Sequence, residues 1–348
     1  MLDLSETAAK QGLENFVARA ASASSARIIA MRRLGGGAVS ENWAVDMTIH
    51  GSRLAGEHAL VVRADAQSRI AESLSRAEEF AVQRVAFLEG VAAPEPLWLC
   101  ADSAYIGRPF YVMRRASGLA DPRRLAREKT LLVSGEALAE QLGQELARLH
   151  SIAPPRDELD FLPVPDRNVV LARVQQFRAA LDTLPEPQPV LEWAIRWLEV
   201  NAPDPQPLVL CHRDYRTGNY LVDEGRLSAI LDWEFAGWSE AYEDIGWFCA
   251  RCWRFGAVER EAGGIGSRAA FYRGYERESA RSVDAARVPY WEAVATVRWA
   301  VIALQQAQRH LSGREPSLEL ALTGRLVPEL EFDLLRHIEM IEQKARPC

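Results

Sequence analysis

The alternation of apolar and polar residues over the first third of the chain predicts a β-rich unit with one long helix. Apolar runs flank the glycines at 35–37, a pattern typical of two strands joined by a turn, and residues 60–62 form the buried run of a third strand. A helical repeat over residues 68–90 then ends at Gly90, which suits a helix C-cap. The other elements expected here are a helix over 4–23 and strands over 92–102 and 108–115.

Helical patterns dominate the chain after Ser117 and Gly118, a pair typical of a turn. Leucines recur along one face of the first of these helices, which indicates that this face is buried. The expected elements are helices over 137–152, 168–182, 190–200 and 240–344 and short strands over 207–212 and 226–233. We therefore expect an α+β chain of two units, residues 1–116 and 117–348.

The composition is that of an ordinary globular protein. Of the 348 residues, 48% are apolar and 26% are charged, which excludes a disordered chain, a collagen-like repeat and a small disulfide scaffold. The net charge of −7 argues against a nucleic-acid partner, because such proteins usually carry a basic domain or stripe. The N-terminus does not resemble a signal peptide, and no apolar run approaches the ~18 residues of a membrane span. An odd number of scattered cysteines is typical of reduced thiols, so we expect a cytoplasmic protein with no membrane partner.

The strongest chemical signal is a short strand that leads into His212 and Asp214, followed five residues after the aspartate by Asn219. A hairpin with its turn at 223–225 then brings Asp232 back to the same place. A carboxylate in such a loop can accept the proton of a hydroxyl, while a carboxamide and a second carboxylate can hold a metal ion. Phosphoryl transfer requires this combination of groups.

These residues resemble the catalytic loop and metal-binding turn of the aminoglycoside phosphotransferase-like family, whose relatives include protein kinases and choline kinases. The likeness extends from about residue 28 to residue 335. It implies a two-lobed protein-kinase-like fold, with an antiparallel sheet and one helix in the first lobe and a mainly helical second lobe. It also implies that ATP, or another nucleoside triphosphate, gives its γ-phosphoryl group with Mg²⁺ to a hydroxyl of a small molecule.

The resemblance assigns roles to individual residues. Asp214 matches the catalytic base, and Asn219 and Asp232 match the Mg²⁺ ligands. Arg216 stands where protein kinases keep a lysine that touches the transferred phosphoryl group, and a guanidinium can make the same contact. The expected nucleotide-binding residues are Gly35, Gly36 and Gly37 in the loop over the phosphates and Val112 and Met113 at the hinge beside adenine.

The third strand departs from the family pattern. Kinases place a lysine there, paired with a glutamate on the following helix, whereas this chain has Arg63. Glu79 is the expected partner, with Glu78 and Glu72 as alternatives. Because arginine does not reproduce the geometry of lysine, the alternative to an active enzyme is a pseudokinase, a nucleotide-binding module with weak or no catalysis. A protein kinase is disfavoured, because only a short segment separates Glu234 from the next helix.

The acceptor pocket is expected among the C-terminal helices, where Trp247 and several arginines lie. A pocket offering Arg251, Arg254 and Arg298 suits an anionic or acyl-type acceptor better than a polycationic aminoglycoside. The competing interpretation is that these arginines form salt bridges with nearby glutamates, for which the candidates are Glu240, Glu243 and Glu292.

Overall fold

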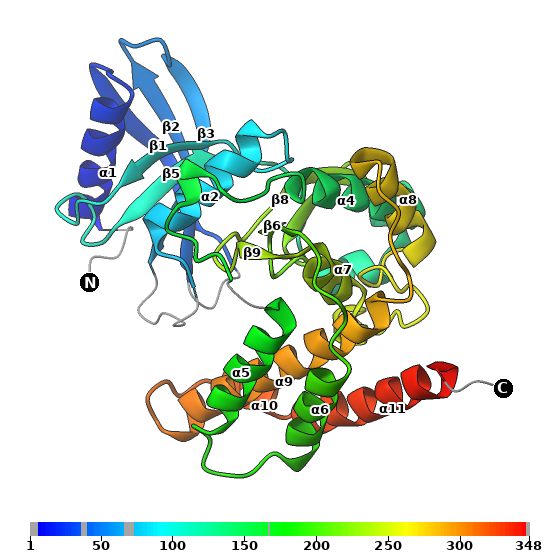
Figure 1. Ribbon diagram of the computed structural model, residues 1–348. Helices are drawn as coiled ribbons and strands as arrows, with labels where there is room; N and C mark the ends of the chain where they lie inside the picture. The colour runs from blue at the N-terminus through cyan, green and yellow to red at the C-terminus, as the bar shows by residue number, and fades with distance from the viewer. Residues whose placement is uncertain (1–5, 36–39, 66–72, 166–167, 346–348) are drawn as a thin grey trace.

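The computed structural model describes residues 6–35, 40–65, 73–165 and 168–345 (Figure 1). Its first part is a five-stranded antiparallel sheet in the order β1-β2-β3-β5-β4. The strands are β1 (Ser25–Arg33), β2 (Ser40–His50), β3 (Gly56–Asp65), β4 (Pro96–Cys100) and β5 (Phe110–Arg114), and the helices are α1 (Thr7–Ala20) and α2 (Arg76–Leu88). The predicted β-rich unit is therefore confirmed.

The two faces of this sheet have different partners. Alternate residues of β3 and β5, among them Val62 and Val112, pack with α1 into one apolar cluster. Val61 and Met113 point to the opposite face, where they pack against Phe80 of α2. The period of two along a strand therefore puts Arg63, two residues after Val61, on the face that α2 covers.

Helix α2 is shorter than the repeat over 68–90 predicts. It begins at Arg76, because Ser75 forms a capping box with Glu78 that satisfies the first backbone N–H groups. Residues 66–72 lie outside the described part of the chain. Gly90 follows the helix end with a φ of 85°, as expected for a residue that terminates a helix.

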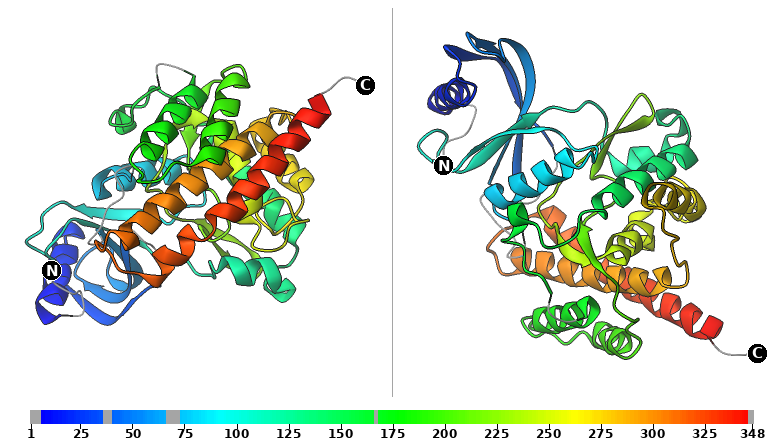
Figure 2. Two further views of the ribbon diagram at one scale, coloured as in Figure 1. Left: turned by 90° about the horizontal axis from the view of Figure 1, so that it is seen from below. Right: turned by 45° about the horizontal axis from the view of Figure 1, so that its top comes forward.

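The second part is mainly helical, as expected. Its larger helices are α4 (Gly135–Leu149), α5 (Val169–Leu181), α6 (Pro189–Val200), α7 (Ala241–Cys249), α8 (Arg268–Ser279), α9 (Val288–Leu311) and α11 (Val327–Ala345), with the short α3 (Pro122–Arg127) and α10 (Leu318–Gly324). Helices α9 and α11 run side by side (Figure 2). Helix α4 crosses α8 at such close range that a Cβ on Gly274 would lie 1.9 Å from the carbonyl oxygen of Glu140.

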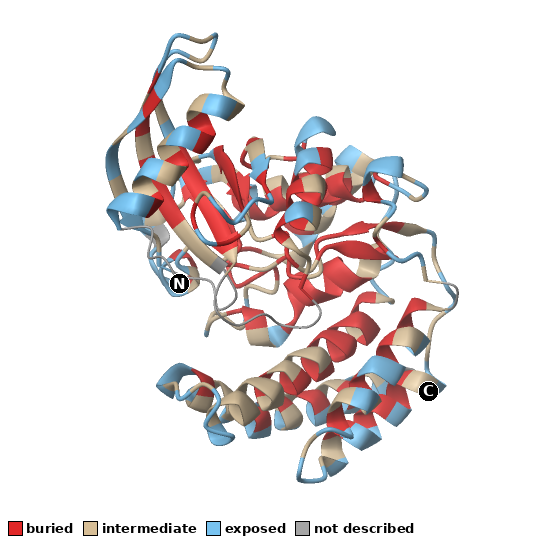
Figure 3. Ribbon diagram, turned by 90° about the vertical axis from the view of Figure 1, so that its left-hand side faces the viewer, coloured by how far each residue is buried: buried red, intermediate tan, exposed pale blue. Residues whose placement is uncertain are grey.

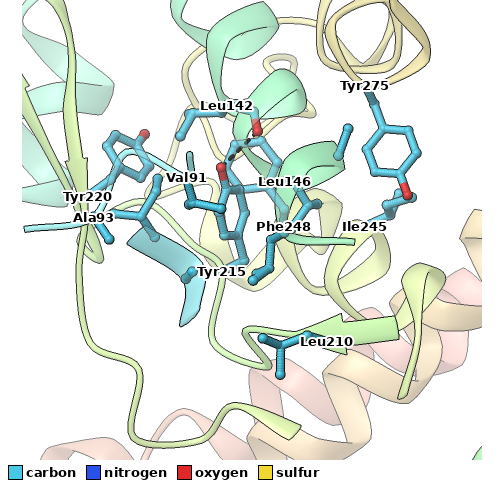
Figure 4. Close-up of a cluster of buried hydrophobic side chains, with 14 of the residues drawn as sticks. Val91, Ala93, Leu142, Leu146, Leu210, Tyr215, Tyr220, Ile245, Phe248 and Tyr275 are labelled. Carbon is cyan, nitrogen blue, oxygen red and sulfur yellow. Dashed lines mark hydrogen bonds between the residues drawn. The ribbon is translucent and has the colours of Figure 1, made fainter. Parts of the chain in front are cut away.

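Two short strand pairs interrupt these helices and carry the loops of interest. Strand β6 (Leu208–Cys211) pairs with β9 (Gly237–Glu240), and β7 (Tyr220–Asp223) forms a hairpin with β8 (Arg226–Ile230). Tyr215, in the loop between β6 and β7, donates a hydrogen bond of 2.8 Å to the carbonyl oxygen of Leu142 on α4 (Figure 4). The loop is thereby attached to the main core of the helical part.

The expected helical stretch over 240–344 is interrupted at residues 250–267, 280–287, 312–317 and 325–326, and the longest of these breaks follows α7. Residues 250–267 form turns and a single 3₁₀ turn, Arg251–Trp253, and strand β9 was not expected. Arg254 stabilises the break, because its guanidinium donates to the carbonyl oxygens of Cys249 and Val258. The carbonyl group of Cys249 at the end of α7 is thus satisfied without a further helical turn.

Burial follows the same division (Figure 3). One apolar cluster fills the sheet and α1, a second joins α2 to α4, α7 and α8, and a third lies among α5, α6, α9 and α11. In the described part of the chain, no helix is both long and apolar enough to cross a membrane.

Candidate active site

The loop between β6 and β7 is held in place by one buried carboxylate. Asp244, on α7, is fully buried and accepts hydrogen bonds of 2.7 Å from the backbone N–H groups of both His212 and Arg213. Arg213 has a φ of 62°, a left-handed conformation that costs free energy for a residue with a side chain. The paired hydrogen bonds offset this cost and fix the direction in which the next residue, Asp214, projects.

Asp214 is almost fully buried, and three side chains hold its carboxylate. Its Oδ1 accepts from Nε of Arg216 at 3.1 Å and from the indole N–H of Trp247 at 3.0 Å. Its Oδ2 accepts from the amide nitrogen of Asn219 at 2.5 Å. The Arg216 guanidinium also lies over the ring of Trp253, 4.8 Å from its centroid. The carboxylate is consequently held in one orientation.

Asn219 and Asp232 are brought together by the backbone. The carbonyl oxygen of Asn219 accepts from the N–H of Leu231, the residue before Asp232, at 2.8 Å. His212 braces the same strand end, since its Nε2 lies 2.9 Å from the carbonyl oxygen of Leu231. This contact gives His212 a structural role.

Arg63 lies at the centre of a buried ion-pair network. Its Nη2 lies 2.8 Å from Oε1 of Glu79, and its Nε donates to Oε2 at 3.1 Å, so Glu79 receives both prongs of the guanidinium. The same Nη2 lies 2.5 Å from Oδ1 of Asp232. Burial opposes the ionisation of Asp232, but the charge of Arg63 prevails and holds the pKa of this carboxyl below its usual value.

A second buried arginine shares this network. Arg76, on α2, pairs with Glu79, with Asp65 at 2.9 Å and with Glu234 at 3.8 Å. Burial, together with the charge of Asp232, raises the pKa of Glu234 to about 8. Of the two alternatives to Glu79, Glu78 caps α2 and Glu72 lies outside the described residues.

The other expected nucleotide-binding residues differ in their surroundings. Gly35 is exposed, with open space around the position of a Cβ, whereas Gly36 and Gly37 lie outside the described residues. Met113 lies on the α2 face of the sheet, where its sulfur accepts from Gln83 at 3.3 Å. The side chain of Val112 points away from that face into the core beneath α1, which leaves only its backbone for a ligand on the α2 side.

The three arginines expected to line an acceptor pocket have separate locations. Arg251 is half exposed and pairs with Asp333 at 3.0 Å, and Arg254 is buried against Glu292 at 3.3 Å. These contacts favour the competing interpretation of salt bridges for both arginines: Arg254 shares Glu292 with Arg268, and Arg251 pairs with Asp333, which was not among the expected glutamates. Arg298, in contrast, donates to the carbonyl oxygen of Arg213, next to Asp214.

Two contacts of the site were not predicted from the sequence. The indole of Trp247 was expected in the acceptor region, but no local pattern predicts its hydrogen bond to Asp214 across 33 positions. Arg76 was not singled out at all, although its i,i+3 spacing to Glu79 on a predicted helix is a signal for an ion pair.

The comparisons with known proteins decide the family. The model of the "Phosphotransferase enzyme family" matches residues 30–281. The chain belongs to this family. Among curated proteins, this phosphotransferase is 30% identical over 182 residues to acyl-CoA dehydrogenase family member 10 of Mus musculus, and 32% over 176 residues to family member 11 of Gallus gallus. The alignments cover 49% and 48% of the chain but only 16% and 22% of those relatives.

Solved structures show the fold of the phosphotransferase. A protein of Ralstonia eutropha, provisionally named an aminoglycoside phosphotransferase, matches with a TM-score of 0.73 at 18% identity, over 95% of this chain and 98% of that one. A spectinomycin phosphotransferase in complex with ADP and spectinomycin matches with a TM-score of 0.62 at 14% identity, over 93% and 98% of the two chains. The predicted two-lobed, kinase-like fold is confirmed.

Proposed function

We propose that this phosphotransferase moves the γ-phosphoryl group of ATP, or of another nucleoside triphosphate, to a hydroxyl of a small molecule. The observation that carries the proposal is the locked carboxylate of Asp214, held by Trp247, Arg216 and Asn219. We place the boundary between the nucleotide lobe and the acceptor lobe at residues 116 and 117, directly after β5.

Asp214 is the base in this proposal. It orients the acceptor hydroxyl and takes its proton as the oxygen attacks the γ-phosphorus. Arg216 keeps one N–H on Asp214, and its fork-shaped guanidinium is suited to the transferred phosphoryl group. Arg63, oriented by Glu79, supplies positive charge for the remaining phosphates.

The donor set beside Asp214 fits Mg²⁺. The side-chain nitrogen of Asn219 donates to Asp214, which leaves the side-chain oxygen Oδ1 of Asn219 as a ligand, and Asp232 keeps one oxygen beyond the one that Arg63 contacts. Magnesium prefers such hard oxygen ligands together with substrate phosphates, and when bound it neutralises charge on the phosphates.

A small-molecule acceptor is favoured by the chain between Asp232 and α7. Only residues 233–240 lie between them, and β9 occupies part of this segment. Such a short connection leaves little chain for the activation loop with which protein kinases position a polypeptide. The names of the curated relatives add hydroxylated acyl thioesters to the acceptors worth testing, beside aminoglycosides, macrolides and choline-like amines.

The test is acceptor-dependent release of ADP by the purified protein with Mg²⁺ and a panel of hydroxylated compounds. We expect at least one acceptor to support turnover, and Asp214→Ala to lower kcat by about 10²–10⁴-fold while nucleotide binding is retained. Turnover by Asp214→Ala at the parent rate would refute the assignment of the base. Nucleotide binding without phosphoryl transfer to any compound would favour the pseudokinase.

A further inference from the structure

A group of arginines gathers beside Asp214. Arg213 comes from the catalytic loop, Arg298 from α9 and Arg173 from α5, so three elements far apart in the sequence contribute to it. All three lie near one carboxylate, that of Glu243 on α7. Arg173 makes a forked contact with Glu243 at 3.1 and 3.2 Å, while Nε of Arg213 is 3.6 Å away from it.

Positive charge exceeds negative charge in this group. Together with Arg216 it contains four guanidinium groups, against the three carboxylates of Asp214, Glu243 and Asp244. Asp244 is hydrogen-bonded to the backbone of the catalytic loop, and Asp214 accepts from Arg216. Among the described residues, Arg213 only shares Glu243 with Arg173, and no carboxylate lies within ion-pair distance of Arg298, although buried charges are ordinarily paired.

Arg213 and Arg298 also repel each other. Burial, and next to it the charge of Arg173, lowers the pKa of Arg213 to about 9, and Arg298 adds to this effect. The pKa of Arg298 is lowered for the same reasons. An added anion would relieve this repulsion, because both guanidinium groups attract it.

Arg298 presents its guanidinium beside the base. Its carbon Cζ lies 4.5 Å from the centroid of the Trp247 ring, whose N–H is bonded to Asp214. One nitrogen donates to the carbonyl oxygen of Arg213, and among the described residues no hydrogen-bond acceptor is recorded for its Nε or for its other terminal nitrogen. The side chain is only partly buried, so these N–H groups can reach a ligand.

We propose that Arg298, with Arg213 behind it, binds an anionic group of the acceptor, so that the acceptor is a hydroxylated carboxylate or organic phosphate. This inference rests on the proposed function only in naming the ligand as the acceptor; the anion-binding subsite itself does not depend on it. Carboxylate and phosphate oxygens match the free edge of a guanidinium. A polycationic acceptor would instead be repelled by the excess positive charge of this group.

The subsite is tested by binding, without phosphoryl transfer. Pentanoate, pentyl phosphate, pentanol and pentylamine each carry a five-carbon chain, and none of them combines an anionic group with a free hydroxyl. Their affinities can therefore be compared by isothermal titration calorimetry at constant ionic strength. We expect at least one anion to bind more tightly than pentanol and pentylamine, and the better anion identifies the carboxylate or phosphate class. Arg298→Met should weaken that anion by about tenfold or more, because a charge-assisted contact is lost.

Two further variants make the result specific. Arg251→Met removes an arginine of the same lobe that is paired with Asp333, and it should bind the anion as the parent does. Arg298→Lys keeps the charge without the fork and should retain part of the affinity, which covers the case in which Arg298→Met does not fold.

The outcomes separate the subsite from the proposed function. Equal binding of pentanol and the anions, tighter binding of pentylamine, or anion binding that survives in Arg298→Met would overturn the subsite. Arg298-dependent anion binding in a protein that phosphorylates no acceptor would leave the subsite standing and count against the proposed function. Phosphorylation of neutral acceptors as fast as of anionic ones would support the proposed function and count against the subsite.

Discussion

Replacing Trp247 by phenylalanine removes one hydrogen bond from the proposed base and keeps an aromatic ring in place. The indole N–H donates to Oδ1 of Asp214 at 3.0 Å, and the ring is buried against Trp253 with 5.1 Å between centroids. A hydrogen bond to a charged group contributes roughly 1.5–3 kcal/mol. If that bond orients the carboxylate in the transition state, Trp247→Phe lowers kcat by about 10- to 100-fold.

A matched control separates orientation from packing. Trp291, on α9, is as deeply buried, but its indole nitrogen has no hydrogen-bond partner in the part of the chain that the structure describes, so Trp291→Phe deletes the same atoms without touching Asp214. The assay is the initial rate of ADP release with the best acceptor of the panel, together with urea unfolding of both variants. We expect Trp247→Phe to lose more stability than Trp291→Phe, by up to the roughly 1.5–3 kcal/mol of the hydrogen bond, and we expect a loss of kcat in Trp247→Phe alone. A kcat within twofold of the control would refute the reasoning.

Two further predictions concern stability. Burial raises the pKa of Glu240 from 4.5 to about 7, which makes its ionised form cost ~3 kcal/mol in the folded state. The stability that the protonated Glu240 contributes is complete below pH 4.5 and is lost as the pH rises through 7. Glu240→Gln should therefore be more stable than the parent by about 3 kcal/mol at pH 8.5 and similar to it at pH 4.5. Equal urea midpoints of the two proteins at both pH values would contradict this prediction. Gly274→Ala should destabilise the fold by about 3 kcal/mol, because its Cβ would meet the backbone of α4, whereas Gly35→Ala, in open space, should leave the thermal midpoint unchanged.

Local patterns in the sequence predicted most of the helices and strands. The apolar alternation of β2, β3 and β5 and the leucine repeat of α4 each reflect burial of one face, which is a property of neighbouring residues. Strand β9 gave no such signal, because all four of its residues are buried and its sequence therefore shows no alternation of buried and exposed positions. The break after α7 depends on contacts of Arg254 with atoms beyond its own turn, which periodicity does not record.

The site was predictable to the extent that it is local. Asp214, Asn219 and Asp232 lie on one loop and one hairpin, and their spacing alone brings them together. Arg298 reaches Arg213 across 85 positions, and in the sequence it looks the same as Arg251. What separates them is Asp333, which neutralises Arg251 and arrives from a helix near the end of the chain. Pairings between distant helices set such differences, and spacing does not encode them.

Arg76 has a consequence for how this enzyme could be regulated. In protein kinases, activity is often switched by moving the helix that carries the glutamate partner of the third-strand cation. Here the first turn of that helix is fastened by a guanidinium that contacts Asp65 at the end of β3 and Glu234 beside the metal turn. Moving α2 away from the sheet would leave several buried charges without their ion-pair partners. We therefore expect a phosphotransferase that is always switched on, with its output set by the supply of acceptor and nucleotide.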